Sequence, residues 1–305
     1  MIQSEWVARA ISEHVGGIEV ELVEIRTSGD RIRDVPLGPH LGQSFFTKEI
    51  EVALLERRID LAVHSCKDLA TTITDGLCLA AVPPREDPRD ALVSSGAPLL
   101  ELPSGARVGT SSPRRKGFLG VARPDLVVQD QRGNVPTRLR AVENGEVDAV
   151  VLAVAGLRRL GLEHRITETL DEPLMVPAAS QGALAVQTRE DDEKTRRAVA
   201  HLDDAPSRAR VTAERACLHT LGAGCQAPVG ALASIDNGQM HLHVAVVTPE
   251  GVVRVDQTRA LATGAWDASA TELGMAAGEA LLARLGLTSM RDAEWAGAAP
   301  QRQGT

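Results

Sequence analysis

The sequence contains no tyrosine, and aromatic residues make up only 2% of it. A core with so few rings must be filled by aliphatic side chains, which suits helices layered on β-sheets. The same scarcity argues against a nucleic-acid-binding protein that stacks bases on aromatic side chains. The 43% of hydrophobic residues is nevertheless ordinary for a globular protein, and 305 residues are enough for two or three compact domains.

Positive charge is also in short supply, because 33 lysines and arginines face 41 aspartates and glutamates and give a formal net charge of −8. A general polyanion binder needs a broad basic surface, so we expect no nucleic-acid partner. The four cysteines form no C-x-x-C pair, and neither a signal peptide nor an apolar stretch of membrane-spanning length is found. We therefore expect a protein of the reducing cytoplasm with no membrane partner, and we assign no metal ligands.

Hydrophobic patterning alternates between the helical period and the strand period along most of the chain. After an amphipathic segment around 6–14, apolar and charged residues alternate at 18–25 and predict a half-buried strand. A helix is then predicted at 48–57, followed by strands at 59–64 and 77–82. These elements indicate βαβ units and hence a parallel or mixed sheet.

Two further sets of elements follow. The second set has predicted strands at 106–109, 126–128 and 149–153, and helices at 113–121, 135–144 and 155–160. The third set has a mainly helical stretch at 196–221, strands at 229–233, 240–247 and 252–258, and a closing helix at 268–285. The tail at 295–305 is expected to be disordered.

Basic and hydroxyl side chains gather where the first strand of the second set ends. The run at 108–115, Val-Gly-Thr-Ser-Ser-Pro-Arg-Arg, joins a strand end to a helix start. Its free backbone N–H groups, hydroxyls and guanidinium groups could converge on a carboxylate or phosphate. The alternative is that a serine caps the helix, Pro113 occupies its first turn, and the arginines are solvated.

Two more basic clusters follow the other strand ends of the same set. Arg132 and Arg138 flank a capped helix start at 131–138, and Arg159 follows the strand that ends at Ala153. Ligands of open α/β sheets bind beyond the carboxyl ends of the strands. The three clusters together therefore predict a polyanionic ligand.

The first set of elements carries a Lys–Asp pair and leads into a run of mixed charge. Lys67 and Asp68 come directly after a predicted strand and are expected to face the cleft between the lobes. Neighbouring Lys and Asp residues most often form a surface ion pair, and that alternative stays open here. The run at 85–90, Arg-Glu-Asp-Pro-Arg-Asp, is interpreted as a hinge crossing between the lobes with internal ion pairs and no catalytic role.

Cys225 lies in the glycine-rich run Leu-Gly-Ala-Gly-Cys-Gln-Ala-Pro at 221–228, directly after a predicted helix. A thiol in such a loop can reach out of its domain. A free cysteine is more often a small buried hydrophobe, so the residue alone leaves both interpretations open.

Taken in order, these motifs resemble the motif set of the porphobilinogen deaminase family, also called hydroxymethylbilane synthases, from about Glu19 onward. The matching runs are His-Ser-Cys-Lys-Asp at 64–68, the charged run at 85–90, Gly-Thr-Ser-Ser-Pro-Arg-Arg at 109–115, Arg-Gly-Asn at 132–134, the run at 153–161, Gln-Gly-Ala at 181–183 and Gly-Cys-Gln at 224–226.

The resemblance implies an α/β fold with two periplasmic-binding-protein-like lobes and a third small α+β domain. We expect domain 1 to comprise residues 1–84 and 178–203, domain 2 residues 85–177, and domain 3 residues 204–305. The implied activity is that of a transferase in tetrapyrrole biosynthesis, the tetrapolymerisation of porphobilinogen to hydroxymethylbilane with release of ammonia. The implied cofactor is a dipyrromethane attached covalently to Cys225.

The resemblance also assigns roles to individual residues. Asp68 matches the catalytic carboxylate, which would stabilise positive charge on the reacting pyrroles and move protons. The positions that would bind cofactor and substrate are Ser65, Lys67, Thr110, Ser111, Ser112, Arg114, Arg115, Arg132, Arg138, Ala153, Arg159 and Gln181. Each pyrrole bears an acetate and a propionate, so a basic cleft in an acidic protein is consistent with this ligand. The resemblance further implies a monomer.

The chain departs from the family pattern in two places. The family ordinarily opens with a strand and a Thr-Arg-x-Ser-x-Leu-Ala type motif, which this chain lacks, so we expect Met1 to be an internal methionine of a longer reading frame. At 37–46 the run Leu-Gly-Pro-His-Leu-Gly-Gln-Ser-Phe-Phe replaces the family's Gly-Gly-Lys-Gly loop, so substrate gating is expected to differ. Two other readings remain, a degenerate family member without activity and a two-lobed solute-binding protein.

Overall fold

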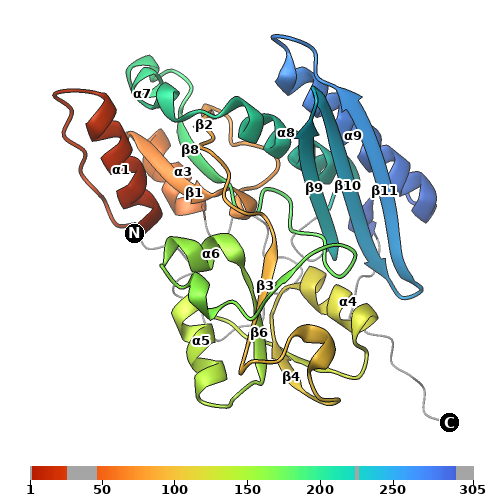
Figure 1. Ribbon diagram of the computed structural model, residues 1–305. Coiled ribbons are helices and arrows are strands. Elements are labelled where there is room, and N and C mark those ends of the chain that lie inside the picture. Colours follow the sequence, from red (N-terminus) through yellow and green to blue (C-terminus); the bar gives the residue numbers. More distant parts are fainter. Residues whose placement is uncertain (1, 26–46, 224–226, 293–305) are drawn as a thin grey trace.

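Three separate β-sheets organise the described residues of the computed structural model, which are 2–25, 47–223 and 227–292 (Figure 1). The chain is a mixed α/β protein with two lobes and a smaller third unit, as predicted. The predicted disordered tail, the altered run at 37–46 and Cys225 lie outside the described residues. Among the described helices, none combines the length and the apolar character needed to span a bilayer.

The sheet of the first lobe has the order β1-β8-β2, and its strands are β1 (Leu61–Ser65), β8 (Leu184–Arg189) and β2 (Leu77–Ala81). Strand β8 is antiparallel to both neighbours. The expected parallel or mixed sheet is therefore wrong for the described strands of this lobe, because a strand that returns from far along the chain lies between β1 and β2. Around this sheet lie the helices α1 (Ile2–His14), α3 (Lys48–Leu55) and α7 (Glu193–Val199).

The strand predicted at 18–25 is not formed. These residues have no regular secondary structure, and none of the described strands pairs with them. Ile18 and Val20 nevertheless pack against the apolar cluster of Val7 and Ile11 from α1. In an extended segment with alternating apolar and charged residues, every second side chain can pack against the core. A β-strand also needs a neighbouring strand that forms hydrogen bonds with its backbone.

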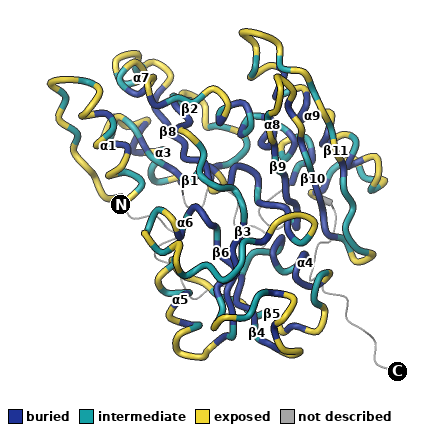
Figure 2. Tube along the Cα trace, viewed as in Figure 1, coloured by how far each residue is buried: buried dark blue, intermediate teal, exposed yellow. Residues whose placement is uncertain are grey.

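The sheet of the second lobe has the order β5-β4-β6-β3-β7. Its strands are β3 (Asp90–Ser94), β4 (Arg107–Gly109), β5 (Val127–Gln129), β6 (Ala149–Ala153) and β7 (Glu168–Leu170). The three strands predicted here are β4, β5 and β6, and β4 runs parallel to both of the others. Strands β3 and β7 were not predicted, although β3 is buried along most of its length (Figure 2). Strand β3 is antiparallel to β6, and β7 is antiparallel to β3.

The helices of the second lobe follow its parallel strands closely. They are α4 (Pro113–Ala122), α5 (Val135–Glu143) and α6 (Val154–Arg159). Ser112 caps α4 by accepting from the backbone N–H of Arg115, and Asn134 caps α5 by accepting from that of Thr137. Both helices have a proline in the first turn, which fixes where each begins.

The third unit is an antiparallel sheet of β9 (Val229–Asp236), β10 (Gln239–Thr248) and β11 (Gly251–Ala260), with β10 in the middle. Two helices, α8 (Ala205–Leu221) and α9 (Trp266–Leu285), pack together on one side of it (Figure 1). Gly274 of α9 lies so close to α8 that a Cβ atom there would collide with the carbonyl oxygen of Ala213. The absence of a side chain at Gly274 therefore sets the approach of the two helices.

A buried ion pair joins these units. Both guanidinium nitrogens Nη1 and Nη2 of Arg85 donate to the carboxylate of Glu214 on α8, at 2.7 and 3.0 Å. The two side chains are 1% and 0% exposed. The expected internal ion pair of the run at 85–90 is present between Arg89 and Asp87, but Arg85 and Asp90 point out of the run to partners elsewhere.

Replacing Glu214 by glutamine should destabilise the protein by about 3–5 kcal/mol, because it leaves the Arg85 charge buried without a counter-charge. Urea unfolding followed by circular dichroism would measure this loss. The control is Glu193→Gln, which removes the exposed i,i+4 partner of Arg197 on α7 and should cost only about 0.5 kcal/mol. Equal losses in the two variants would contradict a structural role for the buried pair.

Candidate active site

The three basic clusters predicted from the sequence meet at one edge of the second-lobe sheet. Strands β5, β4 and β6 lie side by side and are parallel, so the chain leaves all three at the same edge. Thr110 follows β4, Arg132 follows β5, and Ala153 ends β6 as the N-cap of α6. The predicted placement of these clusters at the carboxyl ends of the strands is confirmed.

Arg114 and Arg115 turn inward from the start of α4 onto a single carboxylate. Arg114 donates to Asp90 at 2.7 Å, and Arg115 donates to it at 2.9 and 2.6 Å. Burial alone would raise the pKa of Asp90, but the two guanidinium charges hold it well below its usual range. Two cations facing one anion leave a net positive charge in the buried group, and Nε of Arg114 has no hydrogen-bond partner among the described residues.

Gln181 connects this group to the first lobe. Its side-chain nitrogen donates to Asp90 at 3.0 Å and to the carbonyl oxygen of Pro88 at 2.8 Å. Its side-chain oxygen accepts from Nζ of Lys67 at 3.2 Å. A continuous polar chain thus runs from Lys67 through Gln181 and Asp90 to the two arginines of α4.

Lys67 and Asp68 lie in a short 3-10 turn, Cys66–Asp68, directly after β1. Both side chains are exposed, yet desolvation by the surrounding protein is the largest influence on each of them. It lowers the pKa of Lys67 to about 8 and raises the pKa of Asp68. Desolvation disfavours the charged form of each group, so it lowers the pKa of the ammonium group and raises that of the carboxyl group.

The carboxylate of Asp68 is not used within the described part of the chain. None of the described residues forms a hydrogen bond or ion pair with it, and Lys67 contacts Gln181 instead. Lys67 and Asp68 are not within ion-pair distance in the described structure, although the charge of each still shifts the pKa of the other toward its ordinary value. An exposed carboxylate with a raised pKa is able to stabilise a cation and to exchange a proton with it.

Arg138 and Arg159 bring further positive charge to the same region. Arg138 donates through Nε to the carbonyl oxygen of Gly133 at 2.8 Å, and its pKa is lowered to about 10 by desolvation and by the charge of Arg115. Arg159 donates to the carbonyl oxygen of Gly182 at 2.6 Å, beside Gln181. Arg159 also has a pKa lowered by desolvation. Each of these arginines donates few hydrogen bonds to the described residues, which suits binding of carboxylates.

The remaining predicted binding residues are placed less centrally. Ser111 and Arg132 lie toward Asp130, whose pKa is lowered mainly by a hydrogen bond from Lys116 and less by these two residues. Thr110 is buried, and its hydroxyl accepts from the backbone N–H of Ser112.

Ser65 exchanges hydrogen bonds with Gln3 of α1 at 3.0 and 3.2 Å. Gln3 was not predicted as a site residue. Nothing in the sequence pattern connects a glutamine on the first helix with the end of β1.

Two of the described cysteines are poor candidates for covalent chemistry. Cys66 and Cys217 are buried, burial raises the pKa of the Cys66 thiol, and burial raises that of Cys217 to about 12. Cys225 itself lies outside the described residues, a short distance along the chain from the end of α8 at Leu221. In the described part of the chain no group of acidic, His and Cys side chains could hold a metal ion.

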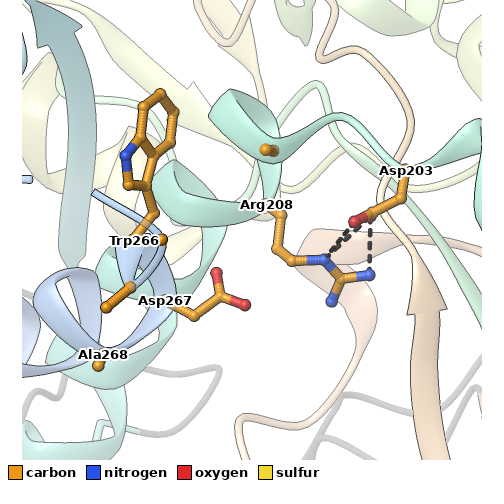
Figure 3. Close-up of a pocket in the computed structure, with 8 residues that line it drawn as sticks. Asp203, Arg208, Trp266, Asp267 and Ala268 are labelled. Carbon is orange, nitrogen blue, oxygen red and sulfur yellow. Dashed lines mark hydrogen bonds and ion pairs between the residues drawn. The ribbon is translucent and has the colours of Figure 1, made fainter. Parts of the chain in front are cut away.

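A separate cavity of about 450 Å³ lies between the beginnings of α8 and α9, lined by Arg208, Trp266 and Asp267 among others. In Figure 3 the guanidinium of Arg208 is turned to Asp203, with which it forms an ion pair. None of the predicted site residues lines this cavity.

Comparisons with known proteins show the family of the chain. Two family models match the chain, "Porphobilinogen deaminase, dipyromethane cofactor binding domain" at residues 1–197 and "Porphobilinogen deaminase, C-terminal domain" at residues 208–283. A curated porphobilinogen deaminase of Sorangium cellulosum is 49% identical over 252 residues, covering 82% of this chain and 84% of that protein. Another from Roseiflexus castenholzii is 45% identical over 287 residues, covering 93% and 95%.

Among solved structures, the substrate-binding protein of an amino acid ABC transporter matches with a TM-score of 0.36 and 15% identity. The match covers 65% of this chain and 78% of that one.

Lys67 should lose its proton near pH 8 because the surrounding protein desolvates its ammonium group. Its charge is present below that pH and is lost as the pH rises through it. Competitive acylation of the lysines across pH 6 to 11, read by peptide mass spectrometry, measures the midpoint directly, since only neutral amines react. A midpoint near the ordinary value of about 10.4 would contradict the desolvated placement of Lys67.

Proposed function

The chain belongs to the porphobilinogen deaminase family, and we propose that Asp68 and the basic residues around it carry this family's reaction here. The reaction is the transferase reaction of tetrapyrrole biosynthesis, which polymerises porphobilinogen into hydroxymethylbilane and releases ammonia. The observation that carries the residue assignment is the carboxylate of Asp68, which is exposed and desolvated and forms no hydrogen bond with the described residues. It lies beside Lys67, which is linked to a group of cations that outnumber their counter-ions.

Substrate binding is assigned to the cations. Every porphobilinogen unit brings an acetate and a propionate, so each addition increases the negative charge that the protein must hold. Lys67, Arg138 and Arg159 offer donors to these carboxylates, and the buried group of Arg114, Arg115 and Asp90 adds net positive charge behind them. Thr110, Ser111, Ser112, Arg132 and Ser65 are proposed as polar contacts at the margins of the same region, and Ala153 and Gln181 as backbone and amide contacts.

Asp68 is proposed as the catalytic residue. Positive charge develops on a pyrrole ring when ammonia leaves and when the next carbon–carbon bond forms, and a nearby carboxylate lowers the energy of that charge. Desolvation both strengthens this attraction and raises the pKa of Asp68 toward the range in which a carboxyl group exchanges protons effectively.

The residues present fit the dipyrromethane cofactor of the family. The buried, unpaired Nε of Arg114 and the cations of the site match the carboxylates that such a group carries. We propose Cys225 as the point of attachment, because two of the other three cysteines are buried thiols with raised pKa values. When bound, the cofactor supplies the pyrrole end to which the first substrate ring is joined.

The domain division proposed from the sequence, with 1–84 and 178–203, 85–177, and 204–305 as units, is supported by the sheets. Each of the three sheets takes all its strands from one of these units. We also propose that the protein acts as a cytoplasmic monomer. Its net charge of −8 supports the proposal that it has no nucleic-acid partner. Light scattering of the purified protein would measure the oligomeric state.

Asp68→Asn should lower kcat by about 100-fold or more, because the amide neither neutralises a cation nor accepts a proton. The assay is consumption of porphobilinogen by the purified holoenzyme. The matched control is Asp75→Asn, which changes an exposed aspartate of the same lobe and should leave kcat unaltered. Unimpaired turnover in Asp68→Asn would refute the proposed role.

Cys225→Ser should abolish covalent attachment of the cofactor, because a serine hydroxyl is a far weaker nucleophile than a thiolate. Intact mass spectrometry would then give the bare chain mass for this variant. For the parent protein it would give that mass increased by two linked pyrrole units. Cys78→Ser is the control and should retain the added mass, since Cys78 lies on β2. An added mass that survives in Cys225→Ser would place the attachment elsewhere.

A further inference from the structure

Helix α8 packs against the turn that carries Asp68. The helix ends at Leu221, shortly before Cys225, and it begins beside the first lobe. Ser207, Val211, Glu214 and Arg215 recur at the spacing of one helical face. All four contact residues outside the third unit, so this face connects the unit with Cys225 to the rest of the protein.

Arg215 holds the segment that follows Asp68. Its Nη1 donates to the carbonyl oxygen of Leu69 at 3.4 Å, and its Nη2 donates to those of Ala70 and, at 3.3 Å, Thr71. These residues belong to no helix or strand, so their carbonyl groups depend on such contacts. A planar guanidinium is well suited to span successive carbonyl oxygens.

Val211, one turn earlier on the same face, holds the turn itself. It packs in one buried apolar cluster with Cys66 and Leu69, the residues on either side of Lys67 and Asp68. Helix α8 thus fixes the backbone on both sides of Lys67 and Asp68. Apolar packing holds this backbone against the helix, and the directional hydrogen bonds of Arg215 fix its orientation.

We propose that Arg215 is a positioning residue that fixes the backbone after Asp68, and with it the Asp68 carboxylate, against α8. The inference rests on the proposed catalytic role of Asp68. It explains why a helix of the third unit supplies donors to three carbonyl groups of the first lobe directly after Asp68. The segment that follows the catalytic carboxylate is then held by a rigid element.

A merely structural role is the competing explanation, and α8 offers a matched control. Arg208 also donates to backbone carbonyls of the first lobe, those of Leu79 and Ala80 on β2, and it pairs with Asp203 (Figure 3). Arg208 therefore makes a similar contact between the same units at the other end of the helix, away from Asp68.

The test compares Arg215→Lys with Arg208→Lys. Lysine keeps the charge but offers a single point of contact, so it cannot span three carbonyl oxygens. Arg215→Lys should lower kcat by about 10- to 100-fold with KM changed less than about twofold, because a small displacement of a catalytic group mainly affects the chemical step. Arg208→Lys should lower the melting temperature comparably but leave kcat within about twofold.

Two measurements do not depend on activity. Hydrogen exchange should become faster at 66–72 in Arg215→Lys and remain unchanged there in Arg208→Lys. Intact mass should show the cofactor still attached in both variants. Loss of the cofactor in Arg215→Lys, or exchange at 66–72 equal to that of Arg208→Lys, would overturn the proposal.

The failure of the proposed function is distinguishable from the failure of this inference. Normal turnover in Asp68→Asn would remove the catalytic role of Asp68 whatever Arg215 does. If Asp68→Asn is inactive while Arg215→Lys and Arg208→Lys have equal kcat values, only the positioning role of Arg215 fails.

Discussion

The buried pair of Arg85 and Glu214 is the interaction on which the relation between the three sheets depends. Each carboxylate oxygen of Glu214 accepts one hydrogen bond from Arg85 and one from a backbone N–H group, that of Ala233 or that of Ser180. Two charges withdrawn from water are costly unless all their hydrogen-bonding capacity is used. Three segments must therefore meet in one arrangement: the crossing at Arg85, the returning segment at Ser180 and the third sheet at Ala233. Apolar packing alone would let these segments slide past one another.

The same constraint reaches the site through Gln181. Nε of Arg85 donates to the backbone carbonyl oxygen of Gln181, so the ion pair also fixes where the Gln181 side chain begins. That side chain in turn joins Lys67 of the first lobe to Asp90 of the second. Gly182 completes the crossing, because a Cβ atom there would collide with the carbonyl oxygen of Glu86. The return of the chain at 180–182 thus serves both the fold and the alignment of the charged groups.

Local signals predicted the parts of the fold that depend on neighbouring residues. The caps Ser112 and Asn134, each followed by a proline, marked the starts of α4 and α5 correctly. Strand β8 was not predicted, because Gln187 and Arg189 are residue types that usually lie on the surface. Both are buried here. Gln187 forms a hydrogen bond with His64, and Arg189 donates to the carbonyl oxygens of Leu54 and Ile59.

The partners of the site arginines could not be predicted from the sequence either. Arg115 and Asp90 lie 25 positions apart, and Arg85 and Glu214 lie 129 apart. No periodicity connects such residues, so the sequence located the basic clusters but not the carboxylate that Arg114 and Arg115 share. The family resemblance indicated the roles of these residues, and the physical reason for their burial came only from the structure.

An acidic protein that binds an increasingly anionic pyrrole chain needs a local excess of positive charge at its site. The net charge of −8 is a property of the whole chain, whereas the site concentrates Lys67, Arg138 and Arg159 beside a buried group in which two arginines share one aspartate. Burying Asp90 with them supplies a fixed counter-ion that keeps the arginines in place without cancelling their charge. The excess that remains attracts carboxylates, whereas the carboxylate of Asp68 is the anion proposed to stabilise the positive charge that develops on the pyrrole rings.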